Sequence, residues 1–251
     1  MLEILQKEAR EILDIELTAE QLRLFQLYYE ELIDWNSRMN LTRITEYEAV
    51  QTRHFLDSLT LASPRLRGDQ PGKALDLHRA RLIDIGAGAG FPGIPLKILY
   101  PELKLTLVES VGKKITFLKH IATRLGFSEV SAINGRAEEL GQDRAHREKY
   151  DLATGRAVAA WPVLAEYCLP FCRVGGLFVA PKKGDLQVEL ENSQAVAKTL
   201  GARMRETPVF TLPGEENDPR RLIVAEKIGR TSTLYPRRTG VPAQQPLDKK
   251  F

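Results

Sequence analysis

Two different hydrophobic periods divide the chain. Over residues 1–62 apolar side chains recur at helical spacing, as in Phe25, Tyr29 and Leu32, which is typical of one face of an α-helix. From Leu82 onward, short apolar runs alternate with helical segments. The first pattern predicts a helical region, and the second predicts repeated βαβ units, hence a parallel sheet covered by helices on both faces.

The helical region contains two capping-box patterns. Thr18-Ala19-Glu20-Gln21 predicts the start of a helix of about four or five turns. Thr45-Glu46-Tyr47-Glu48 predicts a second helix, which runs through His54 and Asp57 until Ser63-Pro64. We therefore expect an N-terminal helical cap over residues 1–62. The simplest interpretation of His54 and Asp57, one turn apart, is polar contact from the helix surface to the domain behind it.

The second region, residues 82–227, predicts a seven-stranded, mostly parallel α/β sheet. Helices are expected from Pro92 and over 113–125, 160–171 and 185–200. No helix separates the last two strands, and Pro213-Gly214 and Asp218-Pro219 lie between them, so an antiparallel last strand is expected. The predicted strands are 82–85, 103–108, 130–133, 151–154, 176–180, 203–210 and 221–226.

A glycine-rich turn follows the first of these strands. Asp84 ends the strand, Gly86, Gly88 and Gly90 form the turn, and Pro92 opens a helix. Glycines let a ligand approach the backbone, and the first amides of the helix present unpaired donors. A nucleotide-like ligand is therefore expected at this strand tip. The glycines fit both a dinucleotide G-x-G-x-x-G motif and the D-x-G-x-G-x-G of S-adenosylmethionine methyltransferases, but the antiparallel ending favours the methyltransferase.

Composition narrows the class of protein. The chain has 251 residues, 43% of them hydrophobic, and no apolar run as long as the roughly 18 residues of a membrane span. Because the N-terminus also lacks a signal-peptide pattern, we expect a cytoplasmic protein. Cys168 and Cys172 are expected to be reduced core residues, and no metal site is expected.

The basic charge of the chain is unevenly distributed. Residues 227–251 carry six Lys or Arg and one Asp, which gives +5, while the whole chain has a net charge of +3. The connection over residues 63–81 is also basic. Such stretches are either solvated loops or surfaces that face phosphate, and we expect the 228–251 tail to pack in part along the sheet domain.

Three further strand ends carry candidate site residues. Glu109 ends the second strand, 109 − 84 = 25 residues after Asp84, where an acid can bind both ribose hydroxyls. Arg136 follows the third strand and Arg156 the fourth, so both are expected to enter the ligand crevice. A guanidinium fork matches phosphate or the O6/N7 edge of guanine, although a salt bridge to Glu138 or Glu139 is the alternative.

Taken together, these residues resemble a known family, the bacterial small-subunit ribosomal RNA guanine-N7 methyltransferases (RsmG, also called GidB). The resemblance covers the chain from about residue 15 to its end. The matching motifs are Asn40-Leu41-Thr42, Arg53-His54 with Asp57-Ser58, the run Asp84 to Pro95, Val108-Glu109-Ser110 with Lys113-Lys114 and Phe117-Leu118, Arg136-Ala137-Glu138, Thr154 with Arg156-Ala157-Val158, and Tyr235-Pro236-Arg237.

The resemblance implies a Rossmann-like class I fold, S-adenosyl-L-methionine as cofactor, and a guanine at position 527 of 16S ribosomal RNA as the target. The expected partner is 16S ribosomal RNA or the small ribosomal subunit, bound by a monomer. With the glycine motif, the resemblance implies these cofactor contacts: Asp84, Gly86, Gly88, Gly90, Phe91, Glu109, Ala137, Glu138 and Arg156. Residues expected to face RNA are Lys113, Lys114, Arg136, Lys182, Lys183, Arg220, Arg237 and Arg238.

The implied chemistry needs no general base, because guanine N7 already has a free lone pair. Arg136 and Arg156 are the candidates for positioning the target. The sequence departs from the family pattern at Ala87 and Gly155, and an extra lysine leaves the register of Lys182-Lys183 open. A nicotinamide-dependent oxidoreductase and a non-catalytic ribosome-associated RNA-binding module remain alternatives.

Overall fold

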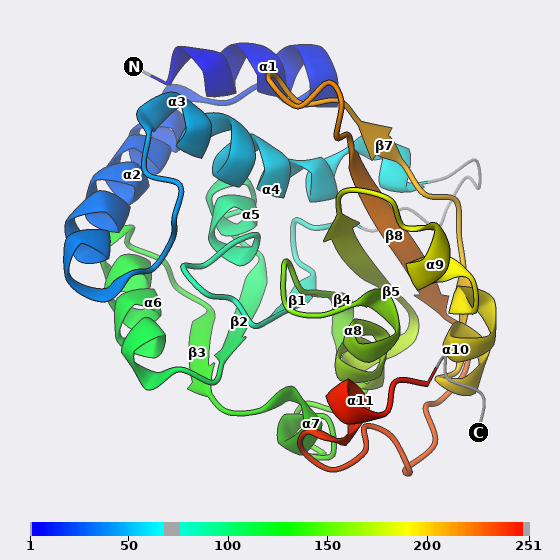
Figure 1. The fold of residues 1–251 in the computed structure, drawn as a ribbon. Helices are drawn as coiled ribbons and strands as arrows, with labels where there is room; N and C mark the ends of the chain where they lie inside the picture. Colours follow the sequence, from blue (N-terminus) through cyan, green and yellow to red (C-terminus); the bar gives the residue numbers. More distant parts are fainter. Residues whose placement is uncertain (1, 68–75, 248–251) are drawn as a thin grey trace.

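The computed structural model describes residues 2–67 and 76–247, and a single sheet forms its centre (Figure 1). In the described chain the sheet has eight strands, in the order β3-β2-β1-β4-β5-β8-β6, with β7 also paired to β8. Their bounds are β1 (Arg81–Ile85), β2 (Lys104–Glu109), β3 (Val130–Asn134), β4 (Tyr150–Thr154), β5 (Cys172–Lys182), β6 (Ala202–Met204), β7 (Val209–Phe210) and β8 (Arg220–Lys227).

The predicted mostly parallel sheet is confirmed. Strands β1 to β5 pair in parallel, and β8 runs antiparallel to β5, β6 and β7. The strand expected over 203–210 is divided into β6 and β7, which accounts for the eighth strand. Pro208, which has no N–H to donate, lies between the two parts, although its carbonyl still accepts from Leu222 N of β8 at 2.9 Å.

The helices of the N-terminal region form the predicted cap. The capping box at Thr18 is confirmed, with Thr18 Oγ1 accepting from Gln21 N and Gln21 Oε1 accepting from Thr18 N. The capping box at Thr45 is wrong: the N-cap is Glu46, without a side-chain cap bond. The cap consists of α1 (Glu3–Leu13), α2 (Ala19–Met39), α3 (Tyr47–Val50), a π-helical turn (Gln51–Leu56), α4 (Asp57–Leu59) and 3₁₀ turns over Thr60–Ala62 and Pro64–Arg67.

The remaining helices cover the two faces of the sheet. Alternate residues of each strand enter different cores, as Leu222 and Val224 pack on the cap side and Ile223 and Ala225 on the other. The long helix predicted over 185–200 is two short helices. The helices after the cap are α5 (Gly93–Leu99), α6 (Gly112–Arg124), α7 (Ala137–Leu140), α8 (Trp161–Cys168), α9 (Gln187–Leu190), α10 (Ser193–Thr199) and α11 (Val241–Gln244), with a 3₁₀ turn at Leu169–Phe171.

The strand order reverses at β1, which has β2 on one side and β4 on the other. A crevice for ligands is expected beyond the carboxyl ends of these strands. The cap helices lie over one side of this region, and Figure 1 shows α11, in red, beside α7 and α8. The site is therefore built from the sheet, the cap and the C-terminal segment together.

The C-terminal segment packs against the sheet domain over its described length. Arg147 donates hydrogen bonds to the carbonyls of Thr231, Ser232 and Tyr235, and Gln142 donates to the carbonyl of Pro236. Residues 248–251 of the predicted tail, and 68–75 of the predicted basic connection, lie outside the described residues. In the part of the chain that is described, no helix is long and apolar enough to cross a membrane.

Candidate functional site

The turn from β1 to α5 requires glycine at defined positions. Gly86, Gly88 and Gly90 have φ values of 68°, 60° and 98°, in the left-handed region that side chains rarely adopt. A Cβ on Gly86 would lie 2.6 Å from Val158 Cγ2, whereas a Cβ on Gly88 would meet only the carbonyl of Gly86, at 3.9 Å. The backbone at Gly88 is therefore open to close approach, as expected for a ligand cradle.

The first amide of α5 is not an open donor, contrary to expectation. Gly93 N donates to Asp84 Oδ2 at 2.9 Å. The other carboxylate oxygen, Asp84 Oδ1, is buried and has no hydrogen-bond partner within the described chain. The pKa of Asp84 is raised to about 7, mainly by burial; the Gly93 bond and the charge of Arg156 oppose this shift, and the charge of Glu109 adds to it. A buried acceptor without a partner is costly, so Asp84 suits a ligand that brings a donor or a positive charge.

Glu109 lies beside the glycine turn, as the spacing predicted. Its Oε2 accepts from Gly88 N at 3.0 Å, and its Oε1 accepts from Val111 N at 2.9 Å. The carboxylate is largely buried, and its orientation is fixed by these two amides. It therefore stands at the tip of β2 with its position set before any ligand binds.

A cavity of about 80 Å³ lies at the carboxyl ends of the first three strands. Four predicted site residues line it: Gly86, Arg136, Ala137 and Glu138. Residues that sequence analysis did not assign to the site also line it, namely Ile85, Val108, Ser110, Gly135, Val158 and Tyr167. The loop after β4 contributes Val158 to the lining, close to Gly86.

Glu138 is held in this cavity from the C-terminal segment. Its Oε1 accepts from Gly240 N at 3.0 Å, although the two residues are 102 positions apart. Arg136, at the cavity rim, is exposed, and no salt bridge from it to Glu138 or Glu139 occurs within the described residues. Sequence reasoning missed the contribution of Gly240, because no local pattern marks a backbone donor that reaches a distant carboxylate.

Arg156 lies on the other side of the glycine turn. Its Nη1 donates to Asp57 Oδ2 at 2.6 Å and to the carbonyl of Arg53 at 3.0 Å. Its guanidinium carbon is 5.1 Å from the centre of the Phe91 ring, close enough for a cation–π contact. The alternative salt bridge to Glu138 or Glu139 is therefore wrong for Arg156.

His54 and Asp57 contact the following domain as expected, but they are buried rather than on a helix surface. The His54 ring stacks on Phe91 with centroids 4.4 Å apart. Burial, and then the charge of Arg156, lower the pKa of His54 to about 3, against the opposing effects of the Arg53 carbonyl and Asp57. His54 is therefore a neutral imidazole at physiological pH.

The residues predicted to face RNA fall into two groups. Lys113, Arg136 and Arg238 are exposed, and Lys114 is partly exposed. The other four are held by acidic partners within the protein: Lys182 by Glu189, Lys183 by Glu215, Arg220 by Asp57, and Arg237 by Glu166. Arg220 is also buried, so in this conformation it does not face solvent.

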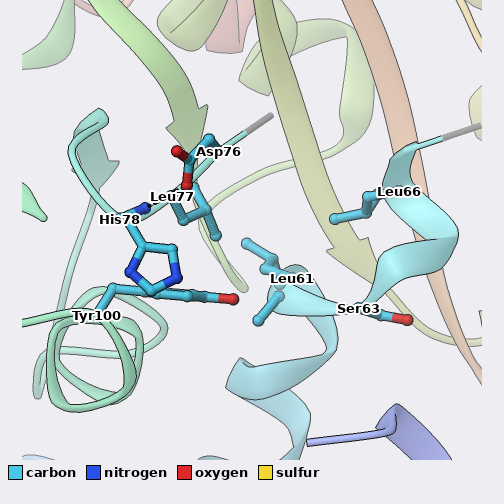
Figure 2. A pocket seen from close by; sticks show the side chains of 8 residues that line it. Leu61, Ser63, Leu66, Asp76, Leu77, His78 and Tyr100 are labelled. Atoms are coloured by element: carbon cyan, nitrogen blue, oxygen red, sulfur yellow. Dashed lines mark hydrogen bonds between the residues drawn. The ribbon is translucent and has the colours of Figure 1, made fainter. Parts of the chain in front are cut away.

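A second cavity, of about 50 Å³, lies near the amino end of β1 and away from the glycine turn. Figure 2 shows it between the end of the cap, at Leu61 and Ser63, and the Leu77 to His78 segment, with the His78 ring against Tyr100. None of the predicted site residues lines it. Within the described residues, no group of three or more His, Cys, Asp or Glu is arranged to hold a metal ion.

Comparison with known proteins identifies close relatives of the whole chain. The family model described as rRNA small subunit methyltransferase G matches residues 21–218. Two relatives are each 48% identical to this chain, over 235 and 233 residues. They are the proteins named ribosomal RNA small subunit methyltransferase G from Dehalococcoides mccartyi (strain CBDB1) and from Roseiflexus sp. (strain RS-1). These alignments cover 94% and 93% of this chain, and 95% and 94% of the relatives.

Among solved structures, the fibrillarin pre-rRNA processing protein of Methanococcus jannaschii has a similar fold. Its TM-score is 0.52 at 16% sequence identity, and the match covers 69% of this chain and 76% of that one. At this identity the likeness concerns the fold alone.

Proposed function

The chain belongs to the rRNA small subunit methyltransferase G family, and from that premise we propose that it transfers a methyl group from S-adenosyl-L-methionine to N7 of a guanine in 16S ribosomal RNA. The proposed target is position 527, in the 530 loop. The observation that carries the proposal is the contact between Gly88 N and Glu109 Oε2. It joins the glycine turn and the ribose-binding acid beside the cavity of β1 to β3.

The residues present fit this cofactor. Gly88 leaves room for close approach to the backbone, and Glu109 can exchange its amide partners for ribose hydroxyls. Asp84 Oδ1 offers a buried acceptor without a partner, which suits the amino group of the methionine part. Gly86, Ala137 and Glu138 would line the base pocket, while Gly90 and Phe91 would shape the turn. When bound, S-adenosylmethionine supplies a methyl group on a positively charged sulfonium.

The protein then has to hold two partners in line rather than move protons. Guanine N7 has a free lone pair, so no residue needs to act as a general base. His54, which is neutral and buried, stacks on Phe91 and contacts Arg156 Nη2, so its role is to hold these side chains in place. Arg156 and Arg136 flank the crevice from opposite sides of the glycine turn, and much of the rate would come from positioning.

We further propose that the exposed Lys113, Lys114, Arg136 and Arg238 contact RNA phosphates. The protein would act as a monomer in the cytoplasm on the small ribosomal subunit or its RNA. Lys182, Lys183, Arg220 and Arg237 would reach phosphate only after leaving their acidic partners, so we assign them a weaker contribution. An oxidoreductase is not favoured, because the relatives are named methyltransferases over nearly their whole length.

The test is transfer of labelled methyl groups to small subunits from cells that lack this activity. We expect N7-methylguanosine in 16S ribosomal RNA, and its loss with Glu109→Ala. Label on protein, or on another base, would refute the proposed substrate. Naked 16S RNA, assembly intermediates and finished subunits should be compared in the same assay, and calorimetric titration should give binding of S-adenosylmethionine but not of NAD.

A further inference from the structure

A cluster of charged side chains joins the cap to the sheet beside the crevice. Asp57 comes from α4, Arg156 from the loop after β4, and Arg220 from the first position of β8. The Asp57 carboxylate is completely buried, and its two oxygens are divided between the two arginines. Its position therefore decides where both guanidinium groups lie.

The guanidinium of Arg156 is held at several points. Asp57 Oδ2 and the Arg53 carbonyl accept from Nη1, Nη2 lies 3.2 Å from His54 Nδ1, and the group lies over the Phe91 ring. A charge-assisted bond of 2.6 Å is the strongest of these contacts. An arginine held in this way has lost its rotamer freedom before substrate arrives.

The charges in the cluster do not cancel. Asp57 supplies one negative charge for two arginines, Glu215 pairs with Arg53 and Lys183, and Lys183 also lies 3.9 Å from Asp218. Three carboxylates therefore face four basic side chains, which leaves one positive charge uncompensated. A net positive region on the crevice side suits RNA phosphate or the O6/N7 edge of guanine.

We propose that Asp57 is a positioning residue for methyl transfer, which acts by fixing the guanidinium of Arg156 beside the target guanine. This inference rests on the proposed function. Positioning groups must be held within about 0.5 Å of the productive geometry, and a carboxylate from the cap supplies that constraint. The cap is then part of the reaction site and not only a cover for the sheet.

The main test compares Asp57→Asn with wild type in single-turnover methylation of small subunits. We expect the methylation rate to fall about 100-fold, and S-adenosylmethionine affinity, measured by calorimetry, to fall much less than the rate, although Arg156 is also an expected cofactor contact. Because Asp57→Asn can fail to fold, Asp57→Glu is the second variant: it keeps the charge but moves the carboxylate, and we expect about a 10-fold lower rate.

A matched control exists on the same cap. Glu31 of α2 also bridges to two basic side chains of the sheet domain, His120 and Arg124 of α6, at 2.6 and 2.7 Å. Glu31→Gln therefore breaks another contact between the cap and the sheet domain, in which the carboxylate is 15% exposed rather than fully buried and Arg156 takes no part, and we expect its methylation rate to stay within twofold of wild type. Equal losses in Glu31→Gln and Asp57→Asn would overturn the proposal.

A double mutant tests whether Asp57 acts through Arg156 or whether its replacement lowers the rate by disturbing the structure in general. In an Arg156→Gln background, Asp57→Asn should lower the rate less than twofold further, because the group that it positions is gone. A full additional 100-fold loss would refute the inference while leaving methylation itself established. Absence of methylation by the wild type would instead refute the proposed function.

Discussion

Replacement of Arg237 by alanine should destabilise the protein and weaken cofactor binding. Arg237 donates four hydrogen bonds to Glu166 of α8: one from its backbone N at 2.8 Å, two from Nε at 2.9 and 3.2 Å, and one from Nη2 at 2.7 Å. The Glu166 side chain is 0% exposed, and that of Arg237 is 19% exposed. Arg237→Ala removes the side-chain donors and leaves a buried carboxylate with the backbone amide.

The size of the effect follows from that burial. Removing one partner of a buried ion pair costs roughly 3–5 kcal/mol, and the residual exposure of Arg237 admits water, so we expect about 3 kcal/mol. For a chain of this length, each kcal/mol shifts Tm by roughly 2–4 °C, which gives a loss of about 6–12 °C. A double variant that carries both Glu166→Met and Arg237→Met should recover much of the lost Tm, because no charged group then stays buried.

The expected loss of cofactor affinity follows from the same ion pair between Arg237 and Glu166. Arg237 holds the segment that carries Gly240, whose amide binds Glu138 in the cavity. We expect calorimetry to show weaker S-adenosylmethionine binding in Arg237→Ala. Arg238→Ala, the exposed neighbour, is the control for stability. A Tm for Arg237→Ala within 2 °C of the Arg238→Ala value would refute the reasoning.

Three further results are expected. Gly86→Ala should lower cofactor affinity at least tenfold by calorimetry, because of its φ of 68° and the contact with Val158, whereas Gly112→Ala, with open space around it, should change it less than twofold. Glu109→Gln should weaken the same affinity while stability stays within about 1 kcal/mol by urea titration, because the amide still accepts one backbone bond. Since the pKa of Asp84 is raised from 3.8 to about 7, the folded state holds the proton more tightly than the unfolded state between these values. Stability from this group therefore falls as pH rises from about 4 to 7, and Asp84→Asn should flatten that slope in urea titrations.

Much of the fold follows from local patterns in the sequence. The glycine turn is recognisable because a short strand, fixed positive-φ positions and a helix start are all encoded within a dozen residues. Glu109 could be placed because the length of one βαβ unit is nearly constant. The prediction of a second capping box was wrong. Thr45 and Glu48 match the sequence pattern, but the helix begins one residue later than the pattern implies, after Glu46.

The charged cluster beside the crevice could not be predicted from local sequence patterns. Asp57 lies 99 residues from Arg156 and 163 from Arg220, and sequence spacing carries no signal over such distances. The π-helical turn that precedes Asp57 also has no simple sequence pattern, although such turns often occur at functional sites. The sequence could suggest that these residues matter, but only the fold brings them together.

Charge counting along the chain does not show which basic side chains are already paired with acids. The basic tail contains Lys227, Arg230 and Arg237, yet all three lie within ion-pair distance of Glu148 or Glu166. Positive charge that is already paired releases few counterions when RNA binds. Since each phosphate contact contributes about 0.7 to 0.9 to the slope of log affinity against log salt, Arg238→Ala should reduce that slope. Arg237→Ala should change that slope only through the displaced segment, because this arginine is already paired with Glu166.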